Sequence, residues 1–83
     1  MVLEFNTKLT PEEVILKAKK FFGAGPGGLG LEVTEDAPCC ATFVGGGGHV
    51  SLSATAGPPH TSVEIETTEW DWQVKQFMHQ TAG

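Results

Sequence analysis

The sequence predicts a single α+β domain of two layers, in which two helices cover one face of an antiparallel sheet. Three observations lead to this fold class. Two segments carry apolar residues at helical spacing, four middle segments alternate apolar and polar residues, and glycine- and proline-rich turns separate them. Because 83 residues are too few for two ordinary domains, residues 1–83 are expected to form one. The expected order is strand, helix, four strands and helix.

A strand and a helix are expected at the start of the chain. Residues 2–5 form a short extended run with Leu3 and Phe5 on one face. Residues 10–13 read Thr-Pro-Glu-Glu, a capping box in which the Thr10 hydroxyl accepts from an orphan amide and Glu13 reaches back. The buried stripe of this helix is Val14, Ile15, Ala18, Phe21 and Phe22. Gly23 is expected to end it in a left-handed conformation.

Four strands with short turns follow, and they are expected to form an antiparallel meander. They are predicted over residues 29–34, 39–44, 49–54 and 61–68. The last of them alternates most clearly, with Val63, Ile65 and Thr67 on one face. The opposite, solvent-facing side is expected to carry Glu32, Thr34, Thr42, Ser51, Ser53, Glu64 and Glu66.

The second helix is predicted to close the chain, after a second capping pattern at residues 68–71. Its apolar stripe consists of Trp70, Val74, Phe77 and Met78. Trp72 falls on the other side of the helix, which it shares with His79. A large aromatic residue on a polar face is typical of an interface or ligand site, although a tilt of the helix would let both tryptophans touch the core.

This order of elements resembles two known fold groups, the half-repeat of TATA-binding proteins and a shortened helix-grip domain of the START, plant-allergen and polyketide-cyclase type. The resemblance covers nearly the whole chain but concerns topology alone, and no functional motif matches. Residues 61–80 look like the strand-to-helix ending of a helix-grip domain. That resemblance implies a pocket for a small apolar ligand between the helices and the sheet. The chain is far shorter than a full helix-grip domain.

The charge balance is acidic, with ten acidic against five basic residues and a formal net charge of -5. Nucleic acids and anionic membrane surfaces both bind through clustered basic residues, so neither is expected as a partner. No apolar run approaches the length of a membrane-spanning helix, and residues 1–5 do not resemble a signal peptide. We therefore expect a soluble cytoplasmic protein.

Cofactor and metal motifs are weak in this sequence. The spacing G-x-G-x-x-G occurs within residues 23–30, but a helix precedes it and a strand follows, the reverse of a dinucleotide-binding site. Cys39 and Cys40 are adjacent, a spacing at which disulfides seldom form, so one buried and one surface thiol are expected. The three histidines do not complete a zinc-binding spacing with them. No cofactor and no metal are predicted.

Three classes of function remain open. The first is a small non-catalytic interaction or dimerisation module, which binds another protein or a second copy of itself. The second is a binder of a small apolar ligand, and the third is an enzyme using Glu64 and Glu66 as an acid and base pair. No catalytic residue is predicted, because an open sheet face lacks the desolvated cleft that a catalytic carboxyl group needs. The candidate ligand or interface residues are Phe22, Glu64, Glu66, Trp70, Trp72 and His79.

Overall fold

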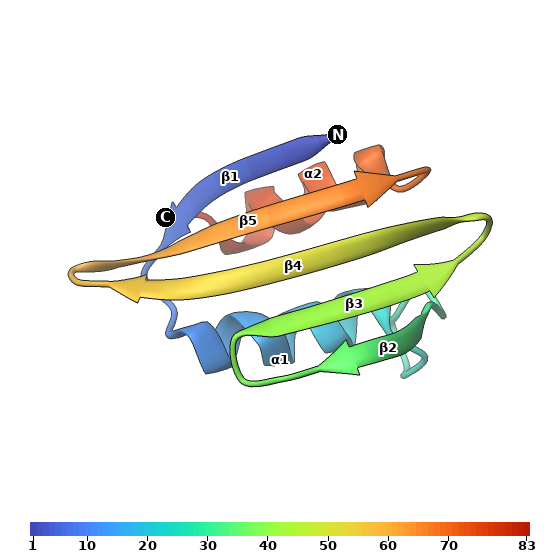
Figure 1. Ribbon diagram of the computed structural model, residues 1–83, viewed down its shortest axis with the longest axis horizontal. Coiled ribbons are helices and arrows are strands. Elements are labelled where there is room, and N and C mark those ends of the chain that lie inside the picture. Colours follow the sequence, from blue (N-terminus) through green and yellow to red (C-terminus); the bar gives the residue numbers. More distant parts are fainter.

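The computed structural model describes residues 1–83 and contains five strands and two helices. In chain order they are β1 (Val2–Thr7), α1 (Pro11–Phe22), β2 (Glu32–Asp36), β3 (Cys40–Gly45), β4 (Gly48–Gly57), β5 (His60–Thr68) and α2 (Asp71–Thr81). The strands form one antiparallel sheet in the order β1-β5-β4-β3-β2, and both helices lie behind one face of it (Figure 1). The predicted fold class and order of elements are confirmed.

The middle of the sheet is the predicted meander from β2 to β5. The longest pairing joins β4 to β5, from His49 opposite Thr68 to Gly57 opposite His60. β1 then adds to the free edge of β5, with Phe5 opposite Val63. The N-terminal strand therefore extends the sheet beyond the last strand of the chain.

The first helix begins where the capping box predicts. The Glu13 amide donates to Oγ1 of Thr10 at 3.2 Å, and the Thr10 amide donates to Oε1 of Glu13 at 2.9 Å. These two bonds satisfy amides that have no partner within the helix. Near the other end, Nζ of Lys19 lies 2.9 Å from a carboxylate oxygen of Asp36, which ties α1 to the end of β2.

Two predicted helix ends differ from the structure. Gly23 is extended, with φ -77° and ψ -172°, so the expected left-handed cap is wrong. A Cβ at Gly23 would lie 2.3 Å from the Lys19 carbonyl oxygen, so close approach accounts for the glycine. The predicted second capping box is also wrong, because Trp70 is the N-cap residue and makes no side-chain capping bond. Thr68 remains in β5, and its hydroxyl lies beside His49.

The strand predicted over residues 29–34 begins only at Glu32. The amides of Leu29 and Leu31 donate instead to the carbonyls of Phe21 and Phe22, at 3.0 and 2.9 Å. These bonds hold residues 29–31 against the end of α1. The residues therefore do not pair with β3, although their apolar side chains alternate as in a strand. Leu31 is buried, but Leu29 is 39% exposed, which contradicts the predicted half-buried strand.

The core lies between the sheet and the helices and consists of 14 buried hydrophobic residues. Phe22 is fully buried, and its ring centroid lies 5.4 Å from those of both Phe43 and Phe77. The aromatic contacts thus join α1, β3 and α2 in one cluster. Neither helix is long and apolar enough to cross a membrane.

Candidate functional site

One face of the sheet carries no helix, and we call it the open face (Figure 1). Burial alternates along β5, where Val63 and Ile65 are buried while Glu64 and Glu66 are exposed. The strand registers extend this alternation across the sheet. The polar side chains of the open face include Glu4, Asn6, Thr42, His49, Ser51, Ser53, Thr55, Ser62, Glu64 and Glu66.

The register aligns these side chains in rows that run across the strands. One row consists of Glu4, Glu64, Ser53 and Cys40, each opposite the next on the neighbouring strand. A parallel row, two residues further along β5, contains Glu66, Ser51, Thr42 and Glu35. Neighbouring strands lie about 4.8 Å apart, so side chains within a row are in reach of one another. The open face is therefore an ordered array of carboxylates and hydroxyls.

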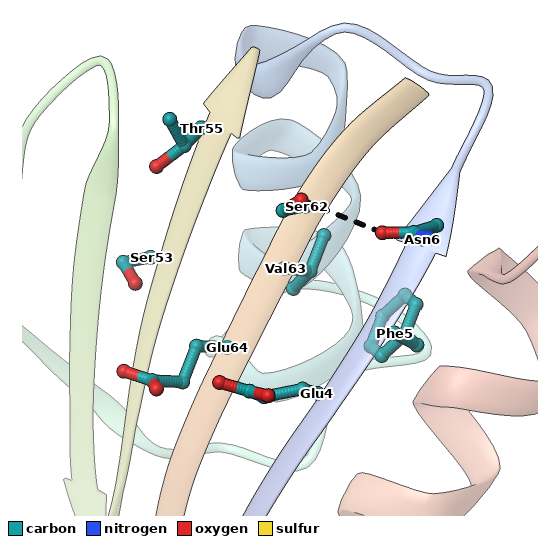
Figure 2. A pocket seen from close by; sticks show the side chains of 8 residues that line it. All are labelled: Glu4, Phe5, Asn6, Ser53, Thr55, Ser62, Val63 and Glu64. Carbon is teal, nitrogen blue, oxygen red and sulfur yellow. Dashed lines mark hydrogen bonds between the residues drawn. The ribbon is translucent and has the colours of Figure 1, made fainter. Parts of the chain in front are cut away.

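Two hollows on the open face share Ser53 and Glu64 and together form one shallow depression, which we call the acidic trough. The first has a volume of about 480 Å³ and is also lined by Glu4 and Asn6 (Figure 2). The second has a volume of about 350 Å³ and is lined by the row that ends at Glu35. The trough therefore crosses the sheet from β1 to β2.

Glu4 and Glu64 lie directly opposite one another in the trough. Met1 and Thr67 exchange both backbone hydrogen bonds, which makes them a hydrogen-bonded pair. Since such pairs alternate along an antiparallel ladder, Glu4 and Glu64 form a non-hydrogen-bonded pair, in which side chains come closer. The two salt bridges of the chain do not involve either carboxylate. Two acidic residues are thus paired across neighbouring strands, and neither has a salt-bridge partner.

The basic residues lie away from the open face. The sequence contains five lysines and no arginine, namely Lys8, Lys17, Lys19, Lys20 and Lys75. Lys8 lies between β1 and α1, and the other four lie on the helices. Because no lysine is part of a strand, the carboxylates of the open face share that face with no lysine, whereas the helices carry residues of both charges. The open face is the acidic side of the molecule.

A hydrogen-bonded network surrounds His49 at one end of the open face. Oγ1 of Thr68 lies 3.1 Å from Nδ1 of His49, whose Nε2 lies 3.2 Å from Oε1 of Glu66. These distances match those between a hydroxyl nucleophile, a base and an orienting carboxylate. However, the side chain of Glu66 is 62% exposed and that of His49 is 34% exposed. Catalysis by such a relay depends on a water-excluded site, which this exposed network does not provide.

The six candidate site residues predicted from the sequence do not form one site. Glu64 and Glu66 lie on the open face, whereas Trp72 and His79 are exposed on α2 in the other layer. Phe22 is fully buried in the core. The sixth, Trp70, is partly buried and donates from Nε1 to the Gly45 carbonyl at 2.9 Å.

Sequence reasoning missed three residues of the open face. Glu4 was not singled out because its partner strand is remote in sequence, and His49 was considered only as a metal ligand. A bulge between Val33 and Glu35 shifts the register, so Glu35 rather than Thr34 lies opposite Thr42. Oε1 of Glu35 accepts a hydrogen bond from the Thr42 hydroxyl at 3.2 Å. The sequence shows that the residues of β2 are mostly acidic, but it does not reveal the bulge.

The cysteines also differ from the expectation. Cys39 and Cys40 form a disulfide, so the prediction of one buried and one surface thiol is wrong. Cys39 ends the turn after β2 and Cys40 is the first residue of β3, so only one of the two belongs to a regular strand.

The space between the helices and the sheet is filled by core side chains. All five hollows of the molecule open to its surface, and none is lined by Phe22, Phe43 or Phe77. No group of three histidine, cysteine or acidic side chains is placed to hold a metal ion.

Comparison of the chain with protein families, curated proteins and solved structures found no match. The acidic trough is the most distinctive surface feature.

Proposed function

We propose that this chain is a small non-catalytic interaction module that binds a lysine- and arginine-rich segment of a partner protein in the acidic trough. The observation that carries the proposal is the pair of opposed carboxylates, Glu4 and Glu64, on a face without lysine. Like charges directly opposite one another on neighbouring strands destabilise a sheet. A cationic side chain between them would remove this repulsion.

The dimensions of the trough favour an extended segment. Five strands at about 4.8 Å spacing are roughly 19 Å across. An extended chain covers about 3.3 Å per residue, so about six residues would cross the sheet. Alternate side chains of that segment would point into the trough, where the hydroxyls of Ser53 and Ser62 lie beside the carboxylates. We therefore expect a motif in which basic residues alternate with small ones.

A second copy of the chain fits this face less well. In a symmetric dimer the same surface is present on both subunits. Stacking two open faces would bring Glu4, Glu64 and Glu66 against the acidic face of the copy, and the charges would repel. The apolar-ligand alternative requires space between the layers, and core side chains fill that space. Charge complementarity therefore favours a separate basic partner.

A titration with a labelled octapeptide of alternating lysine and serine, followed by fluorescence anisotropy, tests the proposal. Glu64→Gln is expected to weaken binding about two- to fivefold, as expected for one surface ion pair. Glu12→Gln is the matched control, because it removes the same charge from α1 and should leave binding unchanged. Equal effects of the two variants would mean that the peptide senses only net charge. Absence of binding at low salt would refute the proposal.

A further inference from the structure

The Cys39–Cys40 disulfide joins two adjacent residues, and the stability of the fold does not explain why it is present. A disulfide stabilises a fold mainly by closing a loop in the unfolded chain, and the effect grows with loop length. A bridge between adjacent residues closes a loop with no intervening residue. It therefore removes almost no entropy from the unfolded chain, and stability does not account for it.

The backbone around the disulfide is held by other bonds. The Ala37 amide donates to the Cys40 carbonyl at 2.8 Å, and the Cys40 amide donates to the Ala37 carbonyl at 3.2 Å. The Ala54 amide donates to the Cys39 carbonyl at 2.8 Å, which fixes the turn to β4. Since none of these bonds involves sulfur, the turn can keep its path when the disulfide opens.

The two cysteines differ in their access to solvent. Cys39 is exposed, whereas Cys40 is partly buried, at the beginning of β3. Exposed disulfides are the ones that thiols attack readily, and attack depends on which sulfur can be reached. Cys39 is therefore the more exposed of the two, although Cys40 also lines the hollow near Glu35.

We propose that Cys39–Cys40 is a thiol-exchange site for a low-molecular-weight thiol of the glutathione class, with Cys39 as the sulfur that is attacked. The thiolate of the small molecule bonds to Sγ of Cys39 while the Cys39–Cys40 bond breaks, and Cys40 leaves as a thiolate that takes up a proton. A second small thiolate then attacks the small-molecule sulfur, releasing its disulfide and the Cys39 thiolate. Two electrons pass in total from two small thiols to the protein.

Glutathione and its disulfide are the probes for this site. The oxidised protein is incubated with millimolar glutathione, quenched with acid and analysed by mass spectrometry. We expect a mixed disulfide that fragmentation maps to Cys39, followed by a dithiol that accepts two alkyl groups. A disulfide that resists glutathione in the folded protein, or a first adduct on Cys40, would overturn the proposal.

Two single variants separate the roles of the cysteines. With glutathione disulfide, Cys40→Ser, which retains Cys39, is expected to form its adduct roughly fivefold faster than Cys39→Ser, because its thiol is exposed. In urea the two unfolded variants should react alike, which attributes the difference to the fold. Equal rates in the folded state would contradict the assignment. Thermal unfolding of the wild type should shift by no more than a few degrees on reduction, and a large shift would show that the disulfide is structural.

Discussion

Glu4 and Glu64 lie opposite one another on β1 and β5, and both side chains line the acidic trough (Figure 2). No strand of the sheet contains a lysine. Their carboxylates belong to residues 60 positions apart in sequence, which only the addition of β1 to β5 brings together. We expect this arrangement to cost the isolated protein some stability, because like charges opposite one another on neighbouring strands repel. The cation binding that we propose would relieve this repulsion, so the same pair would link stability to binding.

The first prediction concerns the stability of the free protein. Glu4→Gln is expected to raise the free energy of unfolding by about 0.5 kcal/mol, because it removes the repulsion from Glu64. Urea denaturation at low salt measures the change, and added salt should reduce it by screening the wild-type repulsion. A loss of stability in Glu4→Gln would show that the carboxylate makes a favourable contact instead.

A second prediction concerns a buried hydroxyl at the end of α2. Oγ1 of Thr81 is buried and has no hydrogen-bond partner. Replacing it by a methyl group in Thr81→Val removes an unsatisfied polar atom, so we expect a gain of about 1 kcal/mol in unfolding free energy.

Thr7→Val provides the contrasting control for the same region. The Thr7 hydroxyl donates to the Thr81 carbonyl and accepts from the Leu9 amide. Its loss leaves both groups without their partner, and stability should fall by roughly 1–3 kcal/mol. Similar effects of the two valine substitutions would contradict this assignment of hydrogen bonds.

The backbone of Glu69 gives a third prediction. Its φ of 71° lies in the left-handed region, where a residue with a Cβ is strained. Glu69→Gly is expected to stabilise the protein by about 1 kcal/mol, as measured by thermal unfolding. Glu69→Ala keeps the strain and serves as the control. If both variants gained equally, the gain would come from the loss of the charge.

The two tryptophans give a fourth prediction, because their environments are opposite. Trp70→Phe loses the bond from Nε1 to the Gly45 carbonyl and should cost about 1 kcal/mol of stability. Trp72 is 63% exposed, so Trp72→Ala should change stability by no more than about 0.5 kcal/mol. It should also leave binding of the basic peptide unchanged, since α2 lies in the other layer. Weaker peptide binding by Trp72→Ala would place the partner on the helices.

The sequence was sufficient to predict which side chains of β3, β4 and β5 face solvent, but not those of β2. Alternation over residues 61–68 and the turns around it assigned Glu64 and Glu66 to the outer side, and the structure confirms this. Alternation is a local property of a strand, so one sequence reveals it. The register between strands is not local. The sequence therefore did not predict that Glu4 lies opposite Glu64. It also did not predict the bulge that places Glu35 beside Thr42.

The backbone between α1 and β2 is another part of the fold that the sequence pattern did not predict. Leucines at residues 29 and 31 alternate as they would in a strand, yet their amides bond to the end of α1. Apolar spacing reports which side chains can be buried together, but not which carbonyl accepts each amide. The adjacent cysteines illustrate a further case, because a rule about typical geometry did not anticipate a disulfide where the turn meets β3.

Mapping of the amide chemical shifts of the isotopically labelled protein, during titration with the lysine-serine octapeptide, tests the central claim most directly. Binding in the acidic trough predicts the largest shifts at Glu4, Ser53, Ser62 and Glu64, with α1 and α2 nearly unchanged. The shifts should disappear as salt is raised. Shifts centred on the helices, or no shift at low salt, would contradict the account.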